Sequence, residues 1–267
     1  MSLRPPRTGA VLNIAHRGNS AQAPENTLAA FASAAAAGAG MIETDLQLSA
    51  DGKVVLIHDG SLARTAGTSL QVAQATADRL RAADAGSWFA PEFTGERIPD
   101  LEDLLVFAAG HPGIGWLLEF KGEWTVEELV PVTEALQQET GGLGERCLLQ
   151  GFSRTTVKNL LAAAPDLLRG LLIAVPPPAG SEAELLEFLA DVGAAACNPH
   201  GAVLAAAPEL VDSLHANGQV VYAWTLNEPA HWEAAVSAGV DGIITDHPAG
   251  LAAWMRLAVP HTSVQGI

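Results

Sequence analysis

Eight short apolar segments recur along the chain, and segments with helical periodicity separate them. Each apolar segment is too short for a helix and consists largely of aliphatic residues, which is typical of strands in a parallel sheet covered on both faces. The predicted strands are Val11–Ala15, Met41–Leu48, Gly115–Phe120, Cys147–Gly151, Gly170–Val175, Ala194–Asn198, Gln219–Trp224 and Val240–Thr245. Strands that alternate with helices in this way predict a parallel α/β fold.

Helical patterns follow most of these strands. The predicted helices are Thr27–Ala37, Thr125–Gln138, Arg154–Ala163, Glu182–Asp191, Pro208–Ala216, Pro229–Ala238 and Pro248–Leu257. An open doubly wound sheet would show the same alternation, but the even spacing and the count of eight favour closure into a (β/α)8 TIM barrel. The 267 residues, 49% of them hydrophobic, match the roughly 250 residues of one such barrel. Because no linker divides them, we expect a single domain over residues 1–267.

A hairpin signal follows the second strand. Asp51-Gly52 is a common two-residue hairpin turn, and it would join the second strand to a further apolar run, Val54–His58. In the register that a two-residue turn sets, His58 lies opposite Asp45. Residues that face each other across two strands share one side of the sheet. We therefore expect the His58 and Asp45 side chains on the same face.

The stretch after this hairpin is too long for an ordinary loop. It contains a helical pattern over Ser69–Ala83 and a second one over Leu101–Ala109. We expect residues 60–100 to form a small inserted cap beside the mouth of the barrel.

The charge balance is acidic, with 30 Asp and Glu against 14 Lys and Arg and a formal net charge of −16. A chain of this sign repels nucleic acid and anionic lipid at long range, so we expect neither nucleic-acid binding nor stable membrane association. No apolar run reaches the roughly 18 residues that a membrane span needs, and no signal-peptide pattern precedes the first strand. These patterns predict a cytoplasmic protein.

Polar residues at the carboxyl ends of the predicted strands are candidates for the functional site, because barrel active sites form there. The first strand ends in His16 and Arg17, and Gly18 allows the backbone to turn sharply. This pair combines a proton carrier with a fixed cation. Taken alone, His16 would be better explained as a structural histidine.

Two carboxylates occur in the second strand. Glu43 and Asp45 are two residues apart and therefore face the same side. Carboxylates directed into an apolar interior repel each other and lose hydration, so a cation is needed to keep both ionised. Because no Cys or His cluster has zinc spacing, the oxygen donors favour Mg²⁺ or Ca²⁺. A solvated acidic strand face is the alternative explanation.

Glu119 and Lys121 repeat this spacing in the third strand, where a structural salt bridge is the alternative. His58 ends the hairpin run, where the alternative is an ordinary loop histidine. Together, the two histidines, the two cations and the three carboxylates match what phosphodiester cleavage requires. A metal and the cations neutralise the phosphate, while two proton carriers serve the nucleophile and the leaving group.

Short motifs run through the chain in a fixed order. They are His16-Arg17-Gly18, Pro24-Glu25-Asn26-Thr27, Glu43-Thr44-Asp45, Asp51-Gly52, His58-Asp59, Arg64-Thr65, Ile98-Pro99, Leu118-Glu119-Phe120-Lys121, Trp224-Thr225 and Gly242-Ile243-Ile244-Thr245-Asp246-His247-Pro248. In this combination and order, the sequence resembles the glycerophosphodiester phosphodiesterase family. The resemblance extends from the first motif to the last and so covers nearly the whole chain.

The resemblance implies hydrolysis of a glycerophosphodiester, such as glycerophosphocholine or glycerophosphoethanolamine, to sn-glycerol 3-phosphate and an alcohol. Carried over by motif position, His16 and His58 would form the acid–base pair. Glu43, Asp45 and Glu119 would hold one divalent cation. By analogy with phosphoinositide-cleaving phospholipases, the glycerol 2-hydroxyl would attack phosphorus and give a cyclic phosphate that water then opens.

Substrate contacts follow from the same resemblance. Arg17 and Lys121 would bind phosphate, and Trp224 would pack against the glycerol carbons or simply belong to the core. Weaker candidates for substrate contact are Gln150, Phe152 and His200.

Two neighbours of the first motif have structural explanations. Asn26 has the residue type of a helix N-cap, and Glu25 is placed to brace Arg17. Cys147 and Cys197 each lie in an apolar run and are predicted to be buried free thiols, with a disulfide or a reactive thiol as alternatives.

Two other functions stay open at this point. A lysophospholipase D that acts on lipid substrates would need an apolar rim at the mouth, for which Trp88, Phe89 and Phe93 are available. A catalytically inactive binding module could also keep the same fold. The retention of both histidines and all three carboxylates favours an enzyme.

Overall fold

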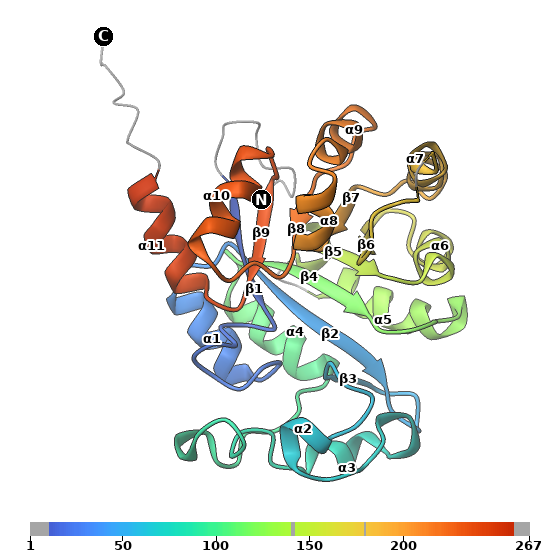
Figure 1. Cartoon of the computed structure of the whole chain (residues 1–267). Coiled ribbons are helices and arrows are strands. Elements are labelled where there is room, and N and C mark those ends of the chain that lie inside the picture. The colour runs from blue at the N-terminus through green and yellow to red at the C-terminus, as the bar shows by residue number, and fades with distance from the viewer. Residues whose placement is uncertain (1–10, 140–141, 179, 259–267) are drawn as a thin grey trace.

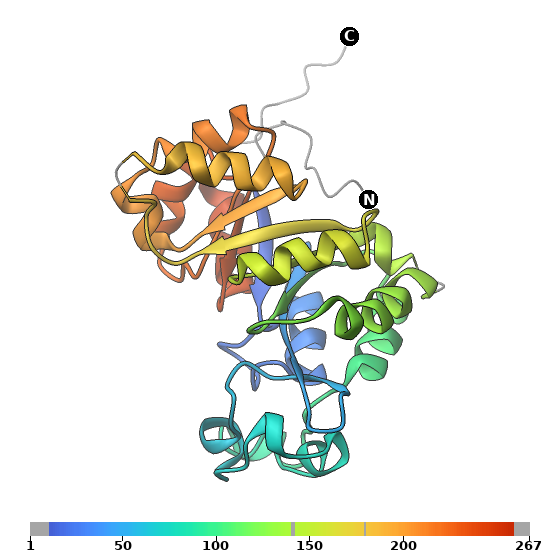
Figure 2. The same cartoon turned by 90° about the vertical axis from the view of Figure 1, so that its right-hand side faces the viewer.

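Parallel strands form a nearly closed barrel in the computed structural model, which describes residues 11–139, 142–178 and 180–258 (Figures 1 and 2). The strands are β1 Leu12–His16, β2 Met41–Leu48, β3 Val54–Leu56, β4 Gly115–Phe120, β5 Cys147–Gly151, β6 Leu168–Ile173, β7 Ala196–Pro199, β8 Tyr222–Ala223 and β9 Gly242–Thr245. Neighbouring strands follow the order β7-β6-β5-β4-β2-β1-β9-β8. Bridges from Ala196 to Val220 and from His200 to Trp224 link β7 to the β8 segment. The TIM-barrel prediction is confirmed, while its predicted limits at residues 1 and 267 lie outside the described residues.

Helices cover the outside of this barrel (Figure 1). They are α1 Leu28–Ala36, α4 Leu101–Gly110, α5 Val126–Gln138, α6 Arg154–Ala163, α7 Glu182–Asp191, α8 Gly201–Ala206, α9 Leu210–Ala216, α10 Pro229–Ser237 and α11 Pro248–Ala258, with the short turn η3 Leu143–Arg146 before β5. Several begin at side-chain caps that satisfy free backbone amides. Thr27 accepts from Ala30 N in α1, and Asp100 and Thr125 form capping boxes at α4 and α5.

Apolar side chains fill the inside of the barrel toward the amino-terminal ends of its strands. We call these residues the floor layer: Ile14, Met41, Leu117, Leu148, Ala196, Tyr222 and Ile244, all at most 1% exposed. Because strand side chains alternate between two faces, the residue two positions further on also points inward. In the same strand order these residues are His16, Glu43, Glu119, Gln150, Asn198, Trp224 and Asp246. The floor layer therefore supports a ring of mostly polar side chains at the carboxyl ends of the strands.

The hairpin register differs from the prediction by one residue. Leu46 pairs with Leu56 and Leu48 with Val54, so the loop has three residues, 50–52, and not two. Gly52 takes a left-handed conformation with φ +72°, which a glycine adopts at little cost. The predicted pairing of His58 with Asp45 is wrong, because Ile57 N donates to Asp45 O and β3 ends before His58.

The segment between β3 and α4 contains α2 Ala63–Ala66, η1 Val72–Gln74, α3 Ala77–Arg81 and η2 Pro91–Phe93, next to β3 in Figure 1. The helix predicted over 69–83 is divided, because Ala75 and Thr76 are extended between η1 and α3. This segment buries a small apolar cluster of its own that includes Leu62 and Leu80. Its description as a cap subdomain over residues 60–100 stays a prediction.

In the described part of the chain, no helix combines the length and the apolar character that a membrane crossing requires.

Candidate active site

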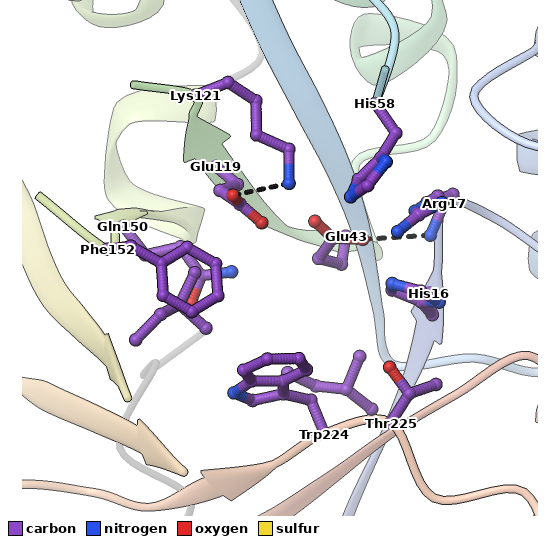
Figure 3. A pocket seen from close by; sticks show the side chains of 12 residues that line it. His16, Arg17, Glu43, His58, Glu119, Lys121, Gln150, Phe152, Trp224 and Thr225 are labelled. Atoms are coloured by element: carbon purple, nitrogen blue, oxygen red, sulfur yellow. Dashed lines mark hydrogen bonds and ion pairs between the residues drawn. The ribbon is translucent and has the colours of Figure 1, made fainter. Parts of the chain in front are cut away.

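A cavity of about 210 Å³ opens at the carboxyl ends of the strands (Figure 3). Its lining residues are His16, Arg17, Glu43, His58, Glu119, Lys121, Gln150, Phe152, Leu172, Trp224, Thr225 and Ile244. All the predicted site residues except Asp45 are in this lining. Asp45 is not in this lining; it is 1% exposed, and its carboxylate lies next to those of Glu43 and Glu119.

The parallel strand register explains why these residues meet. His16 of β1 pairs with Glu43 of β2, and Asp45 of β2 pairs with Glu119 of β4. Glu119 pairs in turn with Gln150 of β5. Paired residues of neighbouring strands point to the same side of a sheet, so this row of polar groups faces the barrel interior together.

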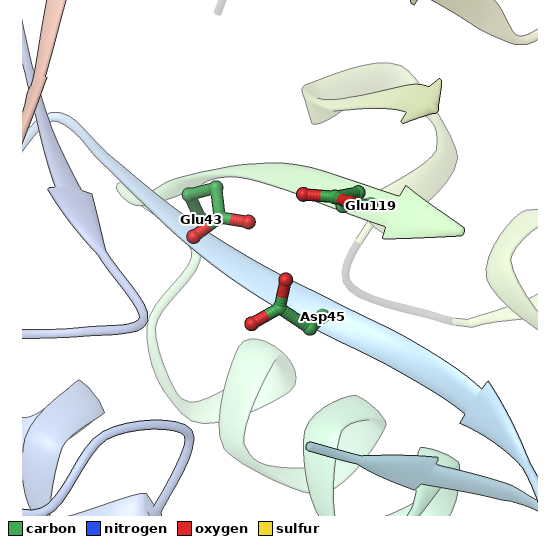
Figure 4. Close-up of side chains that lie close together, drawn as sticks. All are labelled: Glu43, Asp45 and Glu119. Carbon is green, nitrogen blue, oxygen red and sulfur yellow. The ribbon is translucent and has the colours of Figure 1, made fainter. Parts of the chain in front are cut away.

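Three buried carboxylates form the centre of the site (Figure 4). One oxygen from each of Glu43, Asp45 and Glu119 lies within 4.8 Å of the other two. Burial, together with the charges of its two carboxylate neighbours, raises the pKa of Glu43 well above its ordinary value. Burial and the charge of Asp45 raise the pKa of Glu119 to about 7. The positive charge around Glu43 and Glu119 is therefore too small to keep their pKa values in the ordinary range.

Two cations partly compensate these carboxylates. Lys121 Nζ lies 2.9 Å from Asp45 Oδ1 and 2.6 Å from Glu119 Oε1, and Arg17 Nε lies 3.2 Å from Asp45 Oδ2. Although burial opposes it, the charges of Lys121 and Arg17 lower the pKa of Asp45. When all three carboxylates are ionised, they exceed these two cations by one negative charge. A dication that prefers carboxylate oxygens, such as Mg²⁺ or Ca²⁺, fits this donor set.

Arg17 is held by the backbone as well as by its side chain. Its backbone N–H donates to Glu43 Oε2 at 3.0 Å, and Nη1 donates to Glu25 Oε1 at 2.9 Å. The predicted brace by Glu25 is therefore present. Arg17 has φ +54° and Gly18 φ +84°, which turns the chain sharply after β1. A Cβ on Gly18 would meet the Ala30 backbone at 2.6 Å, so a larger residue does not fit there.

The Asp246 carboxylate orients His16, and the sequence had predicted no role for Asp246. The His16 Nδ1 atom lies 2.6 Å from Asp246 Oδ1. Asn227 Nδ2 donates to Asp246 Oδ2 at 2.6 Å, and Ser20 Oγ donates to Oδ1 at 2.9 Å. This arrangement leaves Nε2 as the ring nitrogen of His16 that Asp246 does not bind. Asp246 directly follows a barrel strand, so the rule that selected the other site residues would also have selected it.

His58 has an equivalent partner in the adjoining residue. Its Nδ1 atom lies 2.7 Å from Asp59 Oδ1, so Nε2 is the ring nitrogen that this carboxylate does not bind. Burial lowers the pKa of His58, while the Asp45 charge acts in the opposite direction. Figure 3 shows both imidazole rings near Arg17, with the Phe152 and Trp224 rings across the cavity. The two histidines thus reach one site despite the wrong hairpin register.

Asn26 does not cap a helix, which corrects the prediction. Thr27 caps α1, and Asn26 has a left-handed backbone with φ +56°. Its Nδ2 donates to Asp45 Oδ2 at 2.8 Å, while its Oδ1 accepts from Thr44 Oγ1 at 2.7 Å. Asn26 therefore fixes the orientation of the Asp45 carboxylate. Only the tertiary structure brings these residues together, so the sequence pattern gave no signal for this role.

Aromatic groups form the wall opposite the histidines. The Trp224 Nε1 atom donates to Asn198 O at 2.8 Å, and its ring packs edge-to-face on Phe152 with centroids 5.4 Å apart. Gln150 and Phe152, two of the weaker candidates, line the cavity. His200 is not among the lining residues, and its ring packs edge-to-face on Trp224 with centroids 4.8 Å apart.

The residues offered as an apolar rim lie elsewhere. Phe89 packs edge-to-face between Trp88 and Phe93 within the insertion, with centroid distances of 5.7 and 5.5 Å. None of the three is among the residues that line the cavity in the described part of the chain. The cavity lining therefore gives no support to the lipid-directed alternative.

Comparisons with known proteins agree with this geometry. A Caldanaerobacter subterraneus glycerophosphodiester phosphodiesterase is 33% identical over 243 residues, which cover 89% of this chain and 94% of the relative. The Bacillus subtilis protein YhdW is 35% identical over 241 residues, covering 88% and 94%. A solved Oleispira antarctica phosphodiesterase, in complex with the product sn-glycerol-3-phosphate, superimposes with a TM-score of 0.81 at 30% identity and covers 91% of this chain and 95% of its own. Residues 16–250 match the Glycerophosphoryl diester phosphodiesterase family, and the chain therefore belongs to that family.

Proposed function

We propose that the chain hydrolyses small glycerophosphodiesters, such as glycerophosphocholine and glycerophosphoethanolamine, to sn-glycerol 3-phosphate and an alcohol, with one divalent cation as cofactor. Family membership makes the chain a glycerophosphodiester phosphodiesterase. The observation that carries the finer proposal is one cavity in which three buried carboxylates, two cations and two carboxylate-held histidines meet.

The carboxylates Glu43, Asp45 and Glu119 would hold the cation. A bound dication would neutralise phosphate charge and stabilise the charge that develops during phosphodiester cleavage. Arg17 and Lys121 add two positive charges beside the carboxylates and are placed to bind the phosphate oxygens. Because both are largely buried, their attraction for an anion is less screened than it would be at the surface.

His16 and His58 would carry the protons. Each ring is bound at Nδ1 by a carboxylate, so Nε2 is the atom available to substrate. One histidine accepts the proton of the glycerol 2-hydroxyl as that oxygen bonds to phosphorus. The other donates a proton to the alcohol oxygen as its bond to phosphorus breaks. Water then opens the cyclic phosphate while the two histidines exchange roles, which restores their protons and yields glycerol 3-phosphate.

The size of the cavity favours small substrates. At about 210 Å³ it is smaller than the roughly 300–1,000 Å³ typical of pockets for drug-sized ligands. The Trp224 ring supplies an apolar surface against which the glycerol carbons can pack. The Oleispira antarctica phosphodiesterase holds sn-glycerol-3-phosphate as its product, which supports the same glycerol phosphate half here. A lysophospholipase D activity is the second candidate, but the aromatic residues available for it pack within the insertion.

The decisive assay follows glycerol 3-phosphate release from glycerophosphocholine with Mg²⁺ or Ca²⁺, with and without a chelator. Lysophosphatidylcholine in a parallel assay separates the lipid-directed alternative. We expect metal-dependent release from the small diester and little from the lipid. No release from any glycerophosphodiester with either metal would support the inactive binding module. A cytoplasmic location stays part of the proposal, and cell fractionation tests it.

A substrate without the attacking hydroxyl tests the cyclic intermediate. The phosphodiester of 2-deoxyglycerol retains the phosphate and the leaving alcohol but has no 2-hydroxyl. We expect it to bind as a competitive inhibitor and to release no alcohol. Turnover of this analogue at the rate of the parent diester would show that water attacks phosphorus directly.

A further inference from the structure

One arginine of the insertion links two halves of the candidate site. Arg64 lies in α2, and its guanidinium makes four hydrogen bonds to two carboxylates. Nε and Nη2 donate to Asp59 Oδ2 and Oδ1 at 2.8 and 3.1 Å. Nη1 and Nη2 donate to Glu25 Oε2 and Oε1 at 2.6 and 2.8 Å. Each carboxylate is therefore bound through both of its oxygens.

Each of these carboxylates also binds a residue of the cavity. Asp59 Oδ1 lies 2.7 Å from His58 Nδ1, and Glu25 Oε1 accepts from Arg17 Nη1 at 2.9 Å. Arg17 comes from the end of β1, whereas His58 follows the hairpin strand β3. The Arg64 guanidinium is thus the common centre from which two side chains of different segments are held.

We propose that Arg64 is a positioning residue that fixes the His58 imidazole relative to the Arg17 guanidinium, acting through Asp59 and Glu25. This inference rests on the proposed function, because it takes its meaning from the roles given there to His58 and Arg17. Through Arg64, the insertion would orient two residues of the active site without touching the substrate.

The hydrogen bonds around His58 show why its side chain needs this support. Because β3 ends at Leu56, no strand pairing holds His58. Gln47 Nε2 fixes the backbone there by donating to the carbonyl oxygens of Ile57, His58 and Asp59, at 2.9, 2.8 and 2.9 Å. These bonds leave the imidazole free to rotate about its side-chain torsions. The Asp59–Arg64 pair supplies the remaining constraint, so its loss leaves the backbone held.

The planar geometry of arginine is essential to the arrangement. A guanidinium presents its donors in a rigid fork that matches a carboxylate through two parallel bonds, whereas an ammonium is a single point charge. Lysine at this position would retain the charge but could not orient both Asp59 and Glu25. The corresponding carboxylate for His16, Asp246, is instead held by Asn227 and Ser20 from the barrel itself.

The test compares Arg64→Met with Arg64→Lys and a matched control, Arg81→Met. Arg81 also lies in the insertion and ion-pairs with Asp100 and Asp103, which ties α3 to the start of α4 without touching the cavity. We expect Arg64→Met to lower kcat/KM for glycerophosphocholine about 10- to 100-fold, as the loss of an orienting partner does at metal sites. Most of the loss should appear in kcat, and Arg64→Lys should recover little of it.

We expect Arg81→Met to keep kcat and KM within about twofold while its unfolding temperature falls. Measuring the unfolding temperature of every variant confirms that each is folded at the assay temperature. Full activity in Arg64→Lys would overturn the proposal, because charge alone would then suffice. An equal loss of activity in Arg81→Met and Arg64→Met would overturn it too, since docking of the insertion would then explain both.

A combined variant separates positioning from general stability. Because Arg64 acts through Asp59 and Glu25 together, adding Arg64→Met to a variant that already carries Asp59→Asn and Glu25→Gln should cause little further loss of kcat, since residues in one network are not additive. A further loss as large as that of Arg64→Met alone would contradict the proposal. The proposed function fails separately, if wild-type protein releases no glycerol 3-phosphate. The positioning role fails if His58→Ala abolishes activity while Arg64→Met retains it in full.

Discussion

Asp45 of β2 and Glu119 of β4 are direct neighbours in the barrel, paired residue to residue although they lie far apart in the sequence. Glu43 faces the same interior from two positions earlier in β2, so three carboxylate oxygens lie within 4.8 Å of one another. Lys121 contacts Asp45 and Glu119 and offsets part of their charge. This pairing is the structural basis of the proposed metal site.

Binding of the cation should stabilise the fold independently of catalysis. At a concentration 100 times its Kd, a ligand that binds only the native state contributes about 2.7 kcal/mol. For a chain of this length, that gain corresponds to a rise of about 5–10 °C in unfolding temperature. We expect differential scanning fluorimetry to show this rise with Mg²⁺ or Ca²⁺ for wild-type protein and not for Glu119→Gln. Glu92→Gln, which changes an exposed acid, serves as the control. An undiminished rise in Glu119→Gln would show that Glu119 does not bind the cation.

Removal of either site histidine should suppress turnover. Proton transfer by a positioned side chain contributes about 10²- to 10⁴-fold to a rate, so His16→Ala and His58→Ala should each lower kcat by that range. His231→Ala is the matched control, because His231 is exposed on α10 and should leave kcat within about twofold. Steady-state release of glycerol 3-phosphate measures all three. Unchanged release by His16→Ala or His58→Ala would remove that residue from the acid–base pair.

Loss of the Asp246 carboxylate, which binds His16 Nδ1, should lower the catalytic rate more than the affinity for substrate. Asp246→Asn keeps the size of the side chain but replaces the carboxylate oxygen bonded to Nδ1. We expect kcat to fall about 10- to 100-fold, by the precedent of orienting carboxylates at metal sites, with KM changed little. The measurement is the separate determination of kcat and KM.

A second Asp–His pair at the opposite end of the barrel supplies the control for this variant. His215 Nε2 lies 2.8 Å from Asp241 Oδ2, which also accepts from Val221 N at 2.8 Å. Asp241→Asn should lower the free energy of unfolding by about 1–2 kcal/mol and leave kcat unchanged. Equal kinetic effects of the two substitutions would contradict the orienting role of Asp246.

Both cysteines should resist thiol reagents in the native protein. Cys147 and Cys197 are free and buried, and burial raises the pKa of each thiol to about 12. At pH 8 the reactive thiolate is therefore scarce, and the reagent has no access to it. We expect no labelling by Ellman's reagent at pH 8 and labelling of both thiols after unfolding in urea. Rapid labelling of native protein would show that one of these strands opens readily.

The hairpin shows where reasoning from the sequence reached its limit. The motif Asp51-Gly52 correctly predicted a turn, but its length depends on which residues can pair, and Ser49 bonds Lys53 across a three-residue loop. One added loop residue shifts every pair by one. His58 nevertheless enters the cavity, because the chain leaves the strand after Leu56 and turns inward.

The sequence predicted the bond between Glu25 and Arg17 but not the other partners of the site residues. Asn26 had the residue type of a helix cap, yet it binds Asp45 across the barrel mouth. Asp246 stood in a quoted motif without a role until its contact with His16 was known. The sequence gave Arg64 no predicted partner. In the structure its guanidinium donates to both Asp59 and Glu25.

Sequence alone determined the alternation of strands and helices and the inward-facing polar residues, because each follows from local periodicity. The count of eight strands and their even spacing favoured a closed barrel over an open sheet. A strand residue and the one two positions later share a face, so Ile14 and His16, or Leu117 and Glu119, are fixed relative to each other within one strand. The tertiary structure decided which strands lie side by side and in what register. Those choices arise from packing and pairing between distant segments, and they bring the carboxylates, the histidines and their partners within hydrogen-bonding distance.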